Sequence, residues 1–213
     1  TICAVFAAGK KPTGSSDPLG VRRAALGIIK TIIENSLKIN VVDLIKTAVA
    51  ELPVESYCEK DVEEFFVQRL VIFLADKYSK DVLEACLNKN PLENISDYLK
   101  RVAVVSKFDN QMTIENANRI SRILKDNSFD TIDEALFTTD EERNLFTAVA
   151  EVKDVDSYEE YLQQLVGLNS KIDAFFEKVL VMDKDEKIKN NRIALLSVLR
   201  RYYDKVADFS KIK

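Results

Sequence analysis

The side chains with the clearest chemical potential form two clusters of basic residues. Arg119, Arg122 and Lys125 are spaced i, i+3 and i+6 on a helix predicted over residues 113–126. This spacing places them along one side of the helix, away from its apolar positions. Because arginine and lysine neutralise phosphate groups, this side of the helix is a candidate nucleic-acid contact.

Polar neighbours leave two interpretations of this first cluster open. Asn116 and Asn118 lie close by in the sequence, and their amides suit hydrogen bonding to the edges of unpaired bases. Alternatively, Glu115 and Arg119 are spaced i, i+4, and an ion pair between them would make this side an ordinary solvated face.

The second cluster lies on the last predicted helix, over residues 185–207, and comprises Lys187, Lys189, Arg192, Arg200, Arg201 and Lys205. Arg200 and Arg201 are candidates for phosphate contact, and the adjacent Tyr202 and Tyr203 could stack on single-stranded bases. The tyrosines also fit the apolar stripe of the helix, which favours a structural role. Arg192, on the same helix, is expected to pair with Asp183 or Asp185 and to fix the start of the helix.

Missing groups restrict the chemistry further. The chain has no histidine, which excludes histidine-dependent nucleophiles, general bases and metal ligands. Its three cysteines are odd in number and show no CxxC spacing, so neither a disulfide framework nor a zinc site is indicated. The five glycines form no phosphate-binding loop, since Ser15 stands where such a loop needs lysine. We predict no catalytic residue, no metal site and no cofactor bound by this chain.

Composition and periodicity predict an all-α fold of about ten helices. Glycine and proline are rare, at 5 and 4 of 213 residues, and 46% of the chain is apolar, which favours long helices over a turn-rich β fold. Apolar residues recur at helical spacing along most of the chain. Helices are expected at residues 18–36, 40–51, 60–78, 80–88, 92–107, 113–126, 131–137, 138–152, 157–168, 171–180 and 185–207. No apolar run is long enough to cross a membrane.

Charge is distributed unevenly. The net charge is −4, which argues against an indiscriminate nucleic-acid binder. Residues 126–177 hold 14 acidic and three basic side chains, whereas residues 178–213 hold 10 basic and five acidic ones. An RNA backbone should avoid the acidic middle and approach the two ends.

Two sequence blocks resemble one protein family. The first is Pro-Thr-Gly-Ser-x-Asp-Pro at residues 12–18, followed by Arg-Arg-x-Ala-x-Gly-Ile at residues 22–28. The second runs from Asp173 to Met182 (DAFFEKVLVM) and continues with Asp185 and the segment NRIALL at residues 191–196. Both blocks are similar in order and spacing to the β subunit of bacterial glycyl-tRNA synthetase, the form of that enzyme built from two kinds of subunit.

The resemblance covers essentially the whole chain and implies that it corresponds to the C-terminal part of that subunit. It implies a helical anticodon-binding domain of the type shared with arginyl-tRNA synthetase at residues 59–213, preceded by a helical tail of the subunit's body at residues 1–58. It also implies a cytoplasmic enzyme that couples glycine to tRNA-Gly with ATP and Mg²⁺, its chemistry residing on the α subunit. The partners it implies are tRNA-Gly and the α subunit, with neither membrane nor DNA among them. Of the first cluster, Arg119 matches the family's pattern, whereas Asn118 and Arg122 depart from it.

Two other functions remain as alternatives. A helical docking module without RNA contact would account for the acidic segment and for the missing catalytic groups. An all-α enzyme using paired carboxylates has less support, because adjacent acidic pairs such as Glu63 and Glu64 are typical of the solvent-exposed face of a helix.

Overall fold

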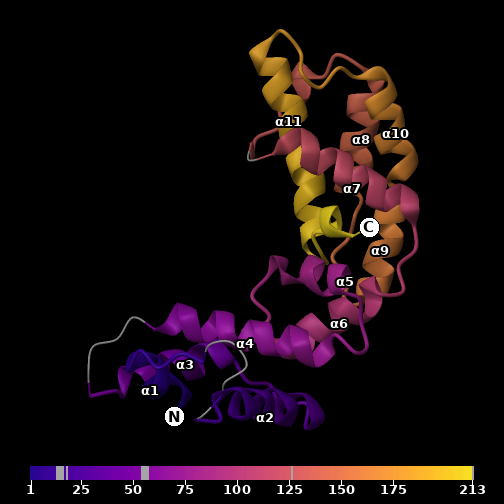
Figure 1. Ribbon diagram of the computed structural model, residues 1–213. Helices are drawn as coiled ribbons and strands as arrows, with labels where there is room; N and C mark the ends of the chain where they lie inside the picture. Colours follow the sequence, from indigo (N-terminus) through magenta and orange to yellow (C-terminus); the bar gives the residue numbers. More distant parts are fainter. Residues whose placement is uncertain (13–16, 18, 54–57, 126, 213) are drawn as a thin grey trace. The chain divides into compact units, whose positions relative to one another are not determined.

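The computed structural model describes residues 1–12, 17, 19–53, 58–125 and 127–212, and all regular elements within these ranges are helical (Figure 1). The all-α prediction is therefore confirmed. The chain divides into two compact units, Thr1–Ser106 and Lys107–Lys213. The first unit contains α1 (Ile2–Ala7), α2 (Val21–Glu34), α3 (Val41–Ala50), α4 (Glu59–Leu74), α5 (Lys80–Ala85), a 3₁₀ turn η1 (Cys86–Asn88) and α6 (Ile95–Val105). The second contains α7 (Gln111–Leu124), η2 (Glu134–Leu136), α8 (Asp140–Ala150), α9 (Tyr158–Gly167), α10 (Asn169–Lys178), α11 (Glu186–Asp204) and η3 (Phe209–Lys211).

Side-chain caps determine where several helices begin. The side chain of Asn40 accepts hydrogen bonds from the first turn of α3, as the sequence predicts. Asn110 does the same for α7, so that helix begins before the predicted Thr113. At α8, Thr139 and Glu142 form a reciprocal capping box. Each such cap satisfies backbone N–H groups that the helix itself cannot pair.

The family-like signature near the N-terminus is only partly described. Residues 13–16 and Pro18 of this signature lie outside the described ranges. The helix begins at Val21, with Gly20 as its N-cap in the left-handed region at φ 66°. Asp17 still contributes to the helix start, because its carboxylate accepts a hydrogen bond from the backbone N–H of Arg22 at 3.1 Å.

In the first unit, α4 is the central element of the core. It packs against α1, α2 and α3 (Figure 1), and the rings of Phe6 and Phe65 meet at a centroid distance of 5.2 Å. Leu70 of α4 and Ile29 of α2 are fully buried. No helix in the described part of the chain has the length and apolar character that crossing a membrane requires.

The boundary predicted after residue 58 does not coincide with this division. The two units meet between Ser106 and Lys107 instead. The reason lies in α4, whose apolar face is buried against the helices that precede it. The helices before and after Pro53 therefore share one core and do not belong to two domains.

In the second unit, α7 packs against both α10 and α11 (Figure 1). Ile120 of α7, Phe175 of α10 and Leu199 of α11 are fully buried. α8 packs on α10 and α11. This arrangement leaves one side of α7 exposed while its apolar side is held in the core.

Candidate nucleic-acid interface

The exposed side of α7 carries the first basic cluster. Arg119, Arg122 and Lys125 are all exposed, and Asn118 beside them is half-buried. The opposite side of the helix is buried through four apolar residues: Ile114, Ala117, Ile120 and Leu124. Amphipathic packing therefore fixes which way the basic side chains face.

A hollow of about 690 Å³ lies between this basic face and α10. It is lined by Glu115, Asn116, Arg119, Arg122, Ile123 and Asp173. The guanidinium carbon of Arg119 lies 4.0 Å from the ring centroid of Phe176, a buried residue of α10. Such a cation–π contact orients the guanidinium and leaves its N–H groups at the edge of the stack.

The charged groups of this hollow are not neutralised by one another. Within the described part of the chain, Arg119, Arg122 and Asp173 form no ion pair, and Arg122 donates one hydrogen bond, at 3.4 Å, to the carbonyl of Asn118. The alternative pairing of Glu115 with Arg119 is not formed, since Glu115 instead accepts a hydrogen bond from Gln111 at 3.1 Å. The hollow thus presents both donors and acceptors that a ligand can reach.

Asn116, considered above as a reader of base edges, belongs to a buried polar network. Its amide N–H donates to the carbonyl of Asn169 at 3.3 Å. Asn169 in turn donates to Thr113 at 2.8 Å and to Asn110 at 3.2 Å. The network ties the start of α10 to the first turns of α7 and so fixes the two walls of the hollow relative to one another.

The second basic cluster is largely neutralised. Arg201 pairs with Asp130 at 2.8 Å, and Lys205 pairs with Asp154 at 3.2 Å. Lys205 also lies over the rings of Tyr161 and Tyr202, at 5.3 and 5.7 Å from their centroids. Because of these contacts, Arg201 and Lys205 have less positive charge available to bind a phosphate than their clustering in the sequence indicates.

Arg200 connects the two clusters. Its Nε lies 2.9 Å from Asp204, and its Nη2 lies 3.5 Å from Asp208. Its Nη1 donates to the hydroxyl of Ser121 on α7 at 2.8 Å. Arg200 therefore helps to hold α11 against α7, and its charge is offset by two carboxylates. Tyr203 is buried, in agreement with the structural interpretation of the tyrosines.

Arg192 pairs with Asp183 at 2.8 Å, which confirms one of the two expected partners. The other, Asp185, instead caps α11 by accepting from the backbone N–H of Lys187. A second partner escaped sequence reasoning: Glu142, fully buried, lies 2.8 Å from Arg192. Burial alone would raise the pKa of Glu142, but hydrogen bonds from Arg192 and from two threonines outweigh burial and lower it. The capping-box spacing from Thr139 to Glu142 was the available signal.

Comparison with known proteins finds a matching protein family for each of the two units. Residues 1–88 match the family model described as glycyl-tRNA synthetase beta subunit, and residues 111–208 match the DALR anticodon binding domain. The full chain also aligns with proteins named glycine–tRNA ligase beta subunit from Geobacter metallireducens, at 32% identity, and Shewanella piezotolerans, at 35% identity. The chain belongs to the glycyl-tRNA synthetase beta-subunit family. It spans 33% of the length of these relatives.

Within this family framework, the predicted contact residues fall in one unit. All seven lie inside the range that matches the anticodon binding domain: Asn118, Arg119, Arg122, Lys125, Arg200, Arg201 and Lys205. The match begins at residue 111, close to the division between the two compact units. The structure brings Arg119 and Arg122 together around one hollow, which Asn118 and Lys125 do not line. Arg201 and Lys205 form ion pairs of their own.

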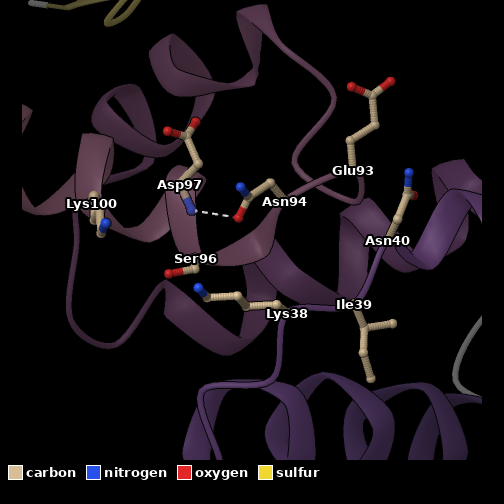
Figure 2. Close-up of a pocket in the computed structure, with 8 residues that line it drawn as sticks. All are labelled: Lys38, Ile39, Asn40, Glu93, Asn94, Ser96, Asp97 and Lys100. Carbon is tan, nitrogen blue, oxygen red and sulfur yellow. Dashed lines mark hydrogen bonds between the residues drawn. The ribbon is translucent and has the colours of Figure 1, made fainter. Parts of the chain in front are cut away.

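The first unit has a hollow of different character. Figure 2 shows this hollow of about 460 Å³, in which the N-cap residues of α3 and α6, Asn40 and Asn94, lie among charged side chains. The charged residues that line it are Lys38, Lys100, Glu93 and Asp97. The charges of the two basic and the two acidic side chains cancel, so this hollow has no electrostatic preference for a phosphate.

Proposed function

We propose that this chain binds the anticodon arm of tRNA-Gly through the exposed face of α7. The observation that carries the proposal is the pair of arginines, Arg119 and Arg122, that lack ion-pair partners in the described part of the chain. They border a hollow inside the range that matches an anticodon binding domain. Arg122 and Lys125 would contact phosphates, and Asn118 and Arg119 would approach bases exposed in the loop.

The wider enzyme is part of the same proposal. The relatives are named glycine–tRNA ligase beta subunit, and we infer that this chain supports the ATP- and Mg²⁺-dependent attachment of glycine to tRNA-Gly in the cytoplasm. Its role there is affinity and choice of tRNA. The family resemblance implies that the chemistry resides on the α subunit, and the sequence of this chain shows no histidine and no glycine-rich phosphate loop.

Binding of the purified protein to tRNA-Gly and to a non-cognate tRNA, across a salt series, tests the proposal. The two phosphate contacts, by Arg122 and Lys125, predict a slope of log K against log[salt] of roughly −1.5 to −2. Arg122→Glu should weaken binding and flatten that slope by about one unit. Arg201→Glu is the matched control, because Arg201 is already paired with Asp130.

A docking module without RNA contact is the second candidate function. One observation favours it: Leu180 and Met182, in the turn between α10 and α11, are exposed apolar side chains. The carbonyl of Leu180 is held by Arg192 at 2.9 Å, so this turn is fixed in place. Absence of tRNA binding at every salt concentration, together with salt-insensitive binding to the α subunit, would favour docking.

A further inference from the structure

The hollow between α7 and α10 has a feature that phosphate binding does not explain. Its α10 wall contributes Asp173, a half-buried carboxylate. Within the described residues, Asp173 takes part in no hydrogen bond or ion pair. Burial raises the pKa of Tyr203, and the negative charge of Asp173 raises it further. A carboxylate repels a phosphate but accepts hydrogen bonds from the amino group of a base.

Two donors from α7, Arg119 and Arg122, line the same hollow as this acceptor. Arg119 is held by stacking on Phe176, which occupies the flat face of the guanidinium and leaves its edge available. The network around Asn169 sets the distance between the walls before any ligand arrives. A planar ligand with one amino donor beside ring or carbonyl acceptors would satisfy both Asp173 and Arg119 at once.

Cytosine has this arrangement of groups. Its Watson–Crick edge presents the N4 amino donor next to the N3 and O2 acceptors, and Asp or Glu is the side chain that accepts from cytosine N4. All glycine codons begin with two guanines, so every tRNA-Gly carries cytosine at the second and third anticodon positions. Uracil presents an acceptor, O4, where cytosine presents its amino group.

We propose that the hollow receives one of these two cytosines, with Asp173 accepting from N4 and Arg119 donating to N3 and O2. This inference rests on the proposed binding of tRNA-Gly and assigns the specificity-determining contact within it. Arg122, at the rim, contacts the adjoining phosphate or ribose. Glu115 lies on the outer side, where Gln111 already donates to it.

Hairpins with the anticodon stem-loop of tRNA-Gly test the assignment by fluorescence anisotropy across a salt series, with base preferences compared at one fixed salt concentration within it. Single C→U changes are made at each of the two cytosines, with C→G changes beside them. The wild-type protein should bind about tenfold more weakly when the cytosine in the hollow becomes uracil. Asp173→Asn should bind the cytosine hairpin more weakly and should lose the preference, because its amide can rotate and donate to uracil O4.

Two further variants separate this contact from general effects. Glu177→Gln makes the same charge change one turn along α10, at an exposed residue outside the hollow, and should leave the preference at its wild-type value. Arg119→Lys keeps the charge but loses the fork of donors, so it should reduce the preference while the salt slope stays unchanged. Circular dichroism checks that each variant is folded.

The outcomes are distinct. Binding of the hairpins with no preference between cytosine and uracil, or a preference that Asp173→Asn and Arg119→Lys both leave intact, would overturn the assignment and leave the proposed function standing. A wild-type preference for guanine over cytosine would also overturn it. No binding of any hairpin at any salt concentration would overturn both.

Discussion

Replacing Arg192 by methionine should destabilise the second unit strongly. Arg192 makes four contacts of 2.8–2.9 Å, to Glu142, Asp183, Thr138 and the carbonyl of Leu180. Methionine fills much of the same space but donates no hydrogen bond. The buried carboxylate of Glu142 would then lose its counter-charge, and removing one partner of a buried ion pair typically costs about 3–5 kcal/mol.

The geometry sets the expected loss near the lower end of that range. Thr138 and Thr139 donate four hydrogen bonds to Oε2 of Glu142, and these survive the substitution. Oε1 depends on Arg192 alone among the described residues. We therefore expect a loss of about 3 kcal/mol in the free energy of unfolding at pH 7, measured by urea denaturation.

The loss should also depend on pH. In the wild-type protein the pKa of Glu142 is lowered, so its contribution to stability is present above the usual carboxyl pKa and is lost as pH falls through the folded-state pKa. Without Arg192, the hydrogen bond that contributes most to lowering that pKa is lost together with the positive charge, so the pKa rises relative to the wild-type protein and Glu142 is protonated at higher pH in the folded variant. The difference between the two proteins should shrink from pH 7 towards pH 4.

Arg201→Met provides the matched control on the same helix. The pair that Arg201 forms with Asp130 is exposed, with 48% and 89% of the two side chains accessible, so its loss should cost no more than about 1 kcal/mol. The reasoning is refuted if Arg192→Met costs less than 1 kcal/mol, if its cost is the same at pH 7 and pH 4, or if Arg201→Met costs as much.

Three further substitutions probe the fold by the same denaturation assay, followed by circular dichroism. Thr139→Ala removes the capping box of α8 and should cost about 1 kcal/mol; an unchanged midpoint would show that Glu142 caps the helix unaided. Leu70→Ala empties a fully buried site in the first unit and should cost about 2–5 kcal/mol, which a loss below 1 kcal/mol would contradict. Asn169→Ala leaves buried partners such as Thr113 unpaired and should cost about 1–3 kcal/mol, whereas an equal loss in Ser170→Ala, at the adjacent exposed residue, would argue against the network.

Periodicity and caps made the fold predictable to the level of individual helices. The apolar stripe of α4 and the cap at Asn40 are local signals, and both agree with the structure. The division into units was not predictable in the same way. Pro53 marks a break in the chain, but only the packing of α4 on α2 and α3 shows that the break lies within one core.

The basic residues of the candidate site could be predicted from the sequence, but their charged partners and neighbours could not. The spacing of Arg119, Arg122 and Lys125 correctly places them on one exposed side of a helix. A pattern limited to one helix cannot show that Arg201 meets Asp130, which is 71 residues away in the sequence. It also cannot show that Asp173 and Arg119 line one hollow, because tertiary packing creates that relationship.

The acidic segment at residues 126–177 supplies partners for basic side chains in addition to forming an acidic surface. From its charge alone, it would be a surface that RNA should avoid, next to a basic C-terminal segment that RNA should approach. In the structure, its carboxylates at Asp130 and Asp154 neutralise the basic residues of that C-terminal segment, and its Glu142 neutralises Arg192 in the core. Much of the basic charge near the C-terminus is therefore used to hold the second unit together. Arg119 and Arg122 of α7 form no ion pair within the described residues and lie in a part of the chain whose net charge is nearly neutral. The position of an RNA contact here therefore follows from which charges are paired and not from regional net charge.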